Sequence, residues 1–342
     1  MRPPEFWKAE VGGRDAALAI RALLTPVSWL YAAAAAHRQR TTTPRHASVP
    51  VVCIGNLTVG GAGKTPITRA IRAKLGAGAH TLSRGYGGRI EGPLRVTPDM
   101  DAREVGDEPL LHARDGAAWI SRDRFAGAMA AAQAGARAII MDDGFQNPAL
   151  GKDVSLIAVD PGFGIGNGQV FPAGPLRERL AAGLARADAI IMLHNKGRPE
   201  TDQRADDGPA EVPDWLAHFT KPILHARLEP SGLLPDRNLV AFAGLARPEK
   251  FFDTLAGMSA KLTETVPFAD HHAYSEEDLG VLAQMAEERD AMLITTEKDA
   301  ARLSPEWRAR VAVLPVTARF DDDAALDALL APIRARMSAA HG

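Results

Sequence analysis

Residues 51–71 read VVCIGNLTVGGAGKTPITRAI, and this stretch limits the possible folds more than any other. An apolar run leads into a glycine-rich turn, after which Lys64 and Thr65 open a helix. Glycines let the backbone N–H groups of such a turn point inward, and the start of a helix attracts a bound anion. A lysine and a hydroxyl then reach the phosphates and Mg²⁺. The stretch therefore predicts a phosphate-binding loop between a buried strand and a helix.

The loop departs from the usual spacing at one position. A glycine is expected six residues before the lysine, and Thr58 stands there. The flanking strand and helix still favour a nucleotide site over an incidental glycine turn. We expect the nucleotide to contact the loop residues Thr58, Gly60, Gly61, Ala62, Gly63, Lys64, Thr65 and Pro66.

From Val49 onward, short apolar runs alternate with helical segments, which is typical of a parallel α/β sheet. One run, AIIMDDGFQ, ends in Asp142 and Asp143. The carboxyl ends of parallel strands form the ligand-binding edge of such a sheet. Adjacent carboxylates repel each other unless a cation offsets their charge. The pattern predicts that Asp142 and Asp143 hold Mg²⁺, directly or through water.

The chain of 342 residues is long enough for two domains. Its composition shifts at residues 198–213, and the strand and helix alternation restarts afterwards. We expect a P-loop-type core domain with a mostly parallel sheet at residues 46–228. A smaller α/β domain at residues 229–342 would close over the site.

The N-terminal segment, residues 1–45, is expected to be helical. Residues 16–36 are mostly apolar and precede the basic segment HRQRTTTPRH, but Arg21 and Pro26 interrupt the run. The helix either packs on the core or lies in a membrane interface, with its aromatic side chains at headgroup level. A full membrane span is the less favoured interpretation.

Charge and cysteine content exclude several classes. The formal net charge of −2 gives no basic field for nucleic acid. The single cysteine, Cys53, excludes an internal disulfide and suits a reducing compartment. Asn195 and Lys196 are followed by glycine and arginine, so the aspartate of a guanine-specific motif is missing. ATP is therefore the expected nucleotide.

A series of motifs spans residues 55–303 in the order GNLTVGGAGKTP, SRGYGG, VGDEP, DDGFQ, PAGPLRE, FADHHAY and TTEKDAARL. In this combination the chain resembles the tetraacyldisaccharide 4′-kinases, the lipid A 4′-kinases of Gram-negative bacteria, which also carry threonine at the position of Thr58. The resemblance implies ATP- and Mg²⁺-dependent phosphorylation of the 4′-hydroxyl of a tetraacylated glucosamine disaccharide. This lipid A precursor would be met at the cytoplasmic face of the inner membrane, with no obligate protein partner.

The resemblance also implies roles for single residues. Asp107 in VGDEP would be the general base, and His271 of the second domain would be its partner, so catalysis would require domain closure. Asp107 is also a good N-cap residue for the helix EPLLHARD, and the two roles are compatible. Lys64 would neutralise the β and γ phosphates. Arg177 would stabilise charge on the transferring phosphoryl group, and Glu178 would join Thr65 and the acid doublet around Mg²⁺.

Tyr86 and Gln146 are further candidate contacts for nucleotide or acceptor. Arg122 or Arg124 would meet acceptor or phosphate, and the sequence does not choose between them. Glu297, Lys298 and Asp299 of TTEKDAARL are given no catalytic role, because helix capping alone would explain them.

Two other classes stay open. A P-loop switch ATPase or GTPase for metal delivery or membrane targeting shares the loop and the acid doublet, although metal-ligating cysteines and the guanine motif are missing. A soluble small-molecule kinase is the second alternative, and in it the first helix would only pack on the core.

Overall fold

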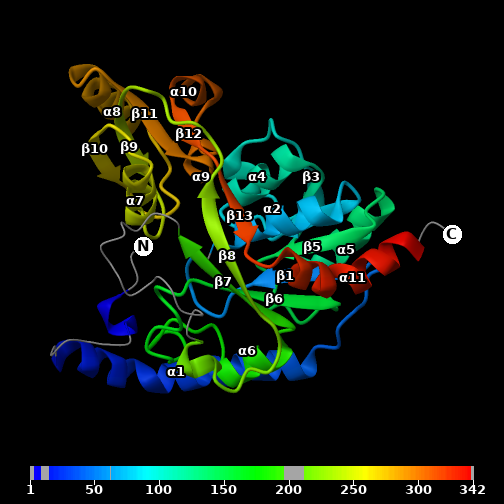
Figure 1. The fold of residues 1–342 in the computed structure, drawn as a ribbon. Coiled ribbons are helices and arrows are strands. Elements are labelled where there is room, and N and C mark those ends of the chain that lie inside the picture. Colours follow the sequence, from blue (N-terminus) through cyan, green and yellow to red (C-terminus); the bar gives the residue numbers. More distant parts are fainter. Residues whose placement is uncertain (1–3, 9–14, 62, 196–211, 340–342) are drawn as a thin grey trace.

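The strands form two sheets that stand side by side (Figure 1). The computed structural model describes residues 4–8, 15–61, 63–195 and 212–339. Within these residues the larger sheet has nine strands in the order β13-β8-β7-β6-β1-β5-β2-β4-β3. These strands are β1 (Val51–Gly55), β2 (Ala79–Ser83), β3 (Leu94–Val96), β4 (Ala118–Ile120), β5 (Ala138–Asp142), β6 (Val154–Val159), β7 (Ala189–Asn195), β8 (Ile223–Pro230) and β13 (Val316–Phe320).

The four strands of the smaller sheet have the order β10-β9-β11-β12. They are β9 (Asn238–Ala243), β10 (Leu262–Pro267), β11 (Ala291–Thr296) and β12 (Ala312–Leu314), and all of them pair in parallel. The larger sheet is parallel except at its edges, where β3 and β13 are antiparallel to their neighbours. The expected α/β fold with a mostly parallel sheet is therefore confirmed.

Strand β1 lies between β5 and β6 in the large sheet. Strands on its two sides are added in opposite directions, so the chain order switches at β1. Open α/β sheets bind ligands at such a switch point, outside the carboxyl ends of the strands. The phosphate loop follows β1 directly and so occupies this position.

Helices cover both faces of the large sheet. Buried side chains of α2 and α11 pack on one face, and α5 and α6 pack on the other. The helices are α1 (Asp15–Thr41), α2 (Lys64–Leu75), α3 (Ala102–Val105), α4 (Asp107–Asp115), α5 (Arg124–Gln133), α6 (Leu180–Arg186), α7 (Glu249–Gly257), α8 (Glu276–Glu288), α9 (Glu297–Ala300), α10 (Pro305–Arg310) and α11 (Asp323–Ala339), with short 3₁₀ turns at Glu5–Trp7 and Asp214–Leu216.

The C-terminal part of the chain differs from the expected domain at residues 229–342. The segment VAVLPVTARF splits at Pro315, so that β12 joins the small sheet and β13 joins the large one. Proline has no N–H to continue a strand ladder, which allows this change of sheet. Leu326 and Leu330 of α11 are then fully buried against the large sheet. The small-sheet unit thus spans residues 238–314, and the last strand and helix extend the core.

Helix α1 is longer than the apolar stretch from which it was expected, and it runs along one edge of the molecule (Figure 1). Ala16–Thr41 is the one helix of the described residues that is long and apolar enough to cross a membrane, judged by length and composition alone. Leu23 and Leu30 are 77% and 73% exposed. The helix therefore presents apolar side chains to its surroundings instead of burying them in the core.

Candidate active site

The phosphate loop runs from the end of β1 to Lys64, the first residue of α2. Gly63 adopts a left-handed backbone with a φ of 71°, and a Cβ atom there would come within 2.2 Å of the Leu193 side chain. A glycine is therefore required for both backbone freedom and space. Gly60 is also left-handed, with a φ of 115°. Ala62 lies outside the described residues.

Asn56, which the sequence analysis missed, holds this loop together. Its side-chain amide donates to the carbonyl oxygens of Thr58 at 2.7 Å and Gly60 at 3.0 Å. Its Oδ1 accepts a hydrogen bond from Nζ of Lys64 at 3.2 Å. Asn56 thus fixes the loop and orients the lysine. Its position between the strand and the glycines could have identified it from the sequence.

A second loop, residues 170–178, is hydrogen-bonded to the phosphate loop. Val59 donates its backbone N–H to the carbonyl of Pro175 at 2.7 Å. The Arg177 guanidinium donates to the carbonyl of Thr58 at 3.1 Å and to both carboxylate oxygens of Asp143, at 2.9 and 3.3 Å. The structure therefore places Arg177 against the phosphate loop, where it contacts the backbone carbonyl of Thr58.

Gln146 and Glu178 lie behind this contact. Gln146 donates from Nε2 to the carbonyl of Asn56 at 2.9 Å and to Glu178 at 3.2 Å. Glu178 is also paired with Arg186 at 2.8 Å. Both predicted residues are at the site, but Glu178 is already engaged by two donors.

The acid doublet ends β5 as expected. Asp142 is 1% exposed, and its Oδ2 lies 2.7 Å from Nε2 of His112, while its Oδ1 is buried with no hydrogen-bond partner. Oδ1 of Asp143 lies 3.7 Å from Nζ of Lys64. Burial raises the pKa of Asp143, but the charges of Lys64 and Arg177 outweigh this effect and leave it below its usual value.

These oxygen atoms suit a magnesium ion. The unpartnered oxygen of Asp142, the carboxylate of Asp143 and the hydroxyl of Thr65 are the hard donors that Mg²⁺ prefers. The described residues contain no cluster of three or more His, Cys, Asp or Glu side chains that would form a complete metal cage.

Asp107 is the first residue of α4 and is 5% exposed. The helix cap is Gly106, so the expected capping role of Asp107 is wrong in this detail. Gly106 has a φ of 91°, and a Cβ atom there would lie 2.5 Å from the carbonyl oxygen of Tyr86, which excludes larger residues. Oδ1 of Asp107 accepts the backbone N–H of Glu108 at 2.9 Å.

The other oxygen of Asp107 faces the small-sheet unit. Oδ2 lies 3.1 Å from Nδ1 of His271, and it accepts hydrogen bonds from Nε and Nη2 of Arg302 at 2.9 and 2.6 Å. Burial raises the pKa of Asp107, but the His271 hydrogen bond and the charges of Lys298 and Arg302 hold it far below its usual range. The aspartate is thus ionised and fixed from both sides of the site.

His271 is held by the backbone as well as by Asp107. Its N–H donates to the carbonyl of Gly244 at 3.1 Å, and its φ is 57°. Tyr86 packs edge-on against the imidazole, with ring centroids 5.6 Å apart. His272 instead lies 3.0 Å from Asp278 and does not join the pair.

The motif TTEKDAARL, which received no catalytic role, supplies two cations to this site. Arg302 is anchored by Asp299 at 2.9 Å as well as by Asp107. Lys298 donates to Glu108 at 2.8 Å, and the charges of Glu108 and Asp107 raise its pKa despite its burial. The motif follows β11 directly, at the carboxyl edge of a parallel sheet, and this position could have indicated a ligand site from the sequence.

The structure distinguishes the two arginines that the sequence could not. Arg122 is exposed and pairs with Glu91. Arg124 is 4% exposed, and its Nε has no hydrogen-bond partner. Burial and the charge of Arg84 lower the pKa of Arg124 to about 10. Arg124 is therefore the one with a buried donor left for a ligand.

Comparison with known proteins gives a consistent result. A family model described as tetraacyldisaccharide-1-P 4′-kinase, LpxK, matches residues 20–334. A tetraacyldisaccharide 4′-kinase from Phenylobacterium zucineum is 51% identical over 317 residues, which cover 91% of this chain and 93% of that one. Its counterpart from Hyphomonas neptunium is 48% identical over 339 residues, covering 97% and 98%.

The fold is also similar to a solved structure. The crystal structure of LpxK from Aquifex aeolicus in complex with ATP superposes with a TM-score of 0.71 at 26% sequence identity. The superposition covers 92% of this chain and 99% of that chain.

Proposed function

The chain belongs to the tetraacyldisaccharide-1-P 4′-kinase family, and we propose that it transfers the γ-phosphoryl group of ATP to the 4′-hydroxyl of tetraacyldisaccharide 1-phosphate. It is thus a phosphotransferase that acts on a hydroxyl group. The observation that carries this proposal is that the phosphate loop and the Asp107 pair form one electrostatic site. Asp142 of the acid doublet contacts His112 of α4 at 2.7 Å, and α4 begins at Asp107, so one helix joins the acids beside the phosphate loop to the base. The charges of Lys298 and Lys64 also lower the pKa of Glu108, the residue after Asp107.

Lys64 and the N–H groups at the start of α2 would bind the β and γ phosphates. Magnesium, when bound, would neutralise phosphate charge, and Thr65, Asp142 and Asp143 would hold it. Glu178 would support this site from behind through Gln146, because its own oxygens already meet Gln146 and Arg186. Arg177 would stabilise charge on the transferring group from the opposite loop.

Asp107 and His271 would take the proton of the acceptor hydroxyl as a pair. A carboxylate that accepts hydrogen bonds from Arg302 and Glu108 has little proton affinity left. Nδ1 of His271 faces Asp107, so Nε2 is the nitrogen that would accept the proton of the hydroxyl. Asp107 would orient the ring and stabilise its charged form.

The two members of the pair come from different units, since Asp107 belongs to the core and His271 to the small-sheet unit. Closure of the second unit over the core would therefore complete the site. The contacts of Arg302 and Lys298 would form in the same closure, because both side chains reach from the small-sheet unit to acids of α4.

We place the protein on the cytoplasmic side of the bacterial inner membrane. The exposed apolar side chains of α1 support this location. Tyr31 of α1 packs edge-on against Phe171, with ring centroids 5.6 Å apart, so the apolar surface extends to the loop before Arg177. An acylated acceptor held at that surface would have its sugar near the phosphate loop.

The test is a transfer assay with γ-labelled ATP, Mg²⁺ and tetraacyldisaccharide 1-phosphate in mixed micelles. We expect label in the lipid, and a product mass increased by one phosphate, only when the metal and the lipid are both present. Release of label to water at an unchanged rate without lipid would contradict the proposal and favour a switch ATPase.

A further inference from the structure

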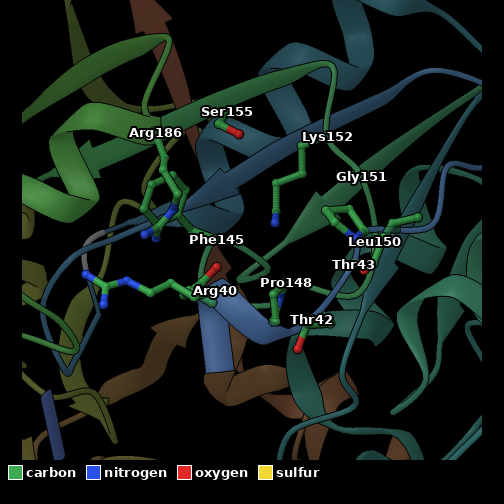
Figure 2. Close-up of a pocket in the computed structure, with 12 residues that line it drawn as sticks. Arg40, Thr42, Thr43, Phe145, Pro148, Leu150, Gly151, Lys152, Ser155 and Arg186 are labelled. Atoms are coloured by element: carbon green, nitrogen blue, oxygen red, sulfur yellow. The ribbon is translucent and has the colours of Figure 1, made fainter. Parts of the chain in front are cut away.

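A cavity of about 470 Å³ lies where α1 ends (Figure 2), and neither Asp107 nor His271 lines it. Its wall combines the last turn of α1 and the residues after it, the loop after the acid doublet, the start of β6 and the end of α6. No role for this cavity follows from the phosphoryl transfer described above.

The cavity carries unbalanced positive charge. Arg40, Lys152 and Arg186 line it, and its lining contains no acidic side chain. Glu178 pairs with Arg186 at 2.8 Å and offsets one of the three charges. Arg40 is exposed and makes no hydrogen bond or ion pair within the described ranges of the chain. The three cations thus share the charge of Glu178, and the cavity keeps an excess of positive charge.

The ammonium group of Lys152 would be stabilised by an anion bound in this cavity. Figure 2 shows its side chain extending between Phe145 and Leu150. Burial and the nearby charge of Arg186 lower the pKa of Lys152, and the charge of Glu178 offsets part of this effect. Its ammonium meets the carbonyl of Asn147. A carbonyl carries no full charge, so an anion in the cavity would stabilise the ammonium further.

The remaining lining fits a phosphate ester. Ser155 and Thr42 offer hydroxyl donors, and arginine is suited to two-point contact with phosphate oxygens. Phe145 and Pro148 give an apolar wall for the carbon skeleton of an ester. A net charge near +2 matches a phosphomonoester better than it matches a carboxylate.

The position of the cavity at the end of α1 also suits a lipid ligand. It opens at the C-terminal end of the apolar helix α1, where cations meet anionic headgroups when such a helix lies in a membrane surface. It borders the active site as well, because Phe145 follows Asp143 by two residues and Arg186 pairs with the neighbour of Arg177.

We propose that this cavity binds the phosphate group of a lipid at the membrane surface. The inference rests on the proposed function only in placing α1 at the membrane. The phosphate belongs either to an anionic phospholipid, as a diester with one negative charge, or to the 1-position of the disaccharide acceptor, as a monoester with up to two. The three cations can bind the phosphate oxygens of either group, and the net charge near +2 favours the monoester.

The test compares Arg40→Gln with Arg38→Gln in the full chain. Both residues are exposed in the last turn of α1, but only Arg40 lines the cavity. Loss of either charge weakens general attraction to an anionic surface about fivefold. A phosphate seated on Arg40 adds a charge-assisted hydrogen bond, so we expect Arg40→Gln to cost more than tenfold.

Two assays distinguish the source of the phosphate. Sedimentation with phosphatidylglycerol–phosphatidylcholine vesicles reports the phospholipid, and KM for tetraacyldisaccharide 1-phosphate in neutral-detergent micelles reports the acceptor. An excess loss for Arg40→Gln over Arg38→Gln in either assay supports the site and identifies its occupant. Lys152→Gln should show the same loss in the same assay.

Equal behaviour of Arg40→Gln and Arg38→Gln in both assays would overturn the proposal. Vesicle sedimentation needs no turnover, so its result stands even if the wild-type protein transfers no phosphate to the lipid. Failure of the kinase assignment and failure of the cavity are thus separate outcomes.

Discussion

Arg302 donates two hydrogen bonds to Oδ2 of Asp107, at 2.6 and 2.9 Å, and both are shorter than the 3.1 Å contact of His271 with the same oxygen. Asp107, His271 and Arg302 therefore form a triad, and the last two belong to the small-sheet unit. Arg302 is 8% exposed, so this contact is screened little by water. It fixes the carboxylate and keeps it ionised.

Arg302→Gln should raise the pKa of Asp107, because it removes a charge that lowers that pKa. We expect kcat to fall at least about tenfold through lost orientation, and the acidic limb of the kcat profile to move to higher pH. Arg302→Lys should recover part of the rate, since it keeps the charge. A pH profile identical to that of the wild type would show that Arg302 is only structural.

His271→Ala should lower kcat by about 100-fold or more, as expected for the loss of a general base. ATP affinity should stay close to that of the wild type, because His271 interacts with Asp107 and Tyr86 and, among the described residues, makes no hydrogen bond, ion pair or ring contact with the phosphate loop. His272→Ala is the matched control, since that ring pairs with Asp278. Equal loss in the two variants, measured by steady-state kinetics, would remove His271 from the pair.

Lys64→Ala should abolish transfer and weaken ATP binding, because it deletes the buried cation of the phosphate loop. Lys74→Ala on the same helix is the control, since that lysine lies at the far end of α2 and pairs with Asp323 at 2.9 Å. Calorimetric titration of ATP with Mg²⁺ measures the difference. Normal turnover of Lys64→Ala would refute the ATP site.

The Asp107 cluster should also make stability depend on pH. The pKa of Asp107 is lowered in the folded state, so the stabilisation is complete above its unfolded value of about 4 and is lost as pH falls toward the folded value. We expect the free energy of unfolding to drop by about 2 kcal/mol from this group between neutral and strongly acidic pH. Asp107→Asn should show a correspondingly flatter profile in urea unfolding, and an unchanged slope would exclude the effect.

The local sequence pattern was sufficient to predict the nucleotide-binding part of the site. The phosphate loop and the acid doublet each follow an apolar strand, so their place at the carboxyl edge of the sheet was predictable from neighbouring residues. The roles of Asp107 and His271 came only from the resemblance. Arg302 meets Asp107 across 195 residues, and no spacing rule reports such a contact.

The path of the C-terminal chain shows the same limit. Strands β12 and β13 both read as short apolar runs, and only tertiary packing assigns them to different sheets. Leu326 and Leu330 of α11 have the periodicity of any amphipathic helix. Their burial against the large sheet depends on where β13 brings the chain, which residue patterns do not encode.

The exposed face of α1 gives the last prediction. Leu23 and Leu30 are 77% and 73% exposed, and full burial of a leucine in an apolar phase contributes about 2 kcal/mol. Leu23→Ser with Leu30→Ser should therefore reduce binding to neutral phosphatidylcholine vesicles by roughly two orders of magnitude or more. Ala33→Ser with Ala34→Ser, two exposed positions on the same helix, should change vesicle binding little.

Activity on micellar acceptor should fall with vesicle binding while the affinity for ATP is kept, because α1 has no part in the phosphate loop. If the leucine variant sediments with vesicles like the wild type, α1 packs on the core without anchoring the enzyme.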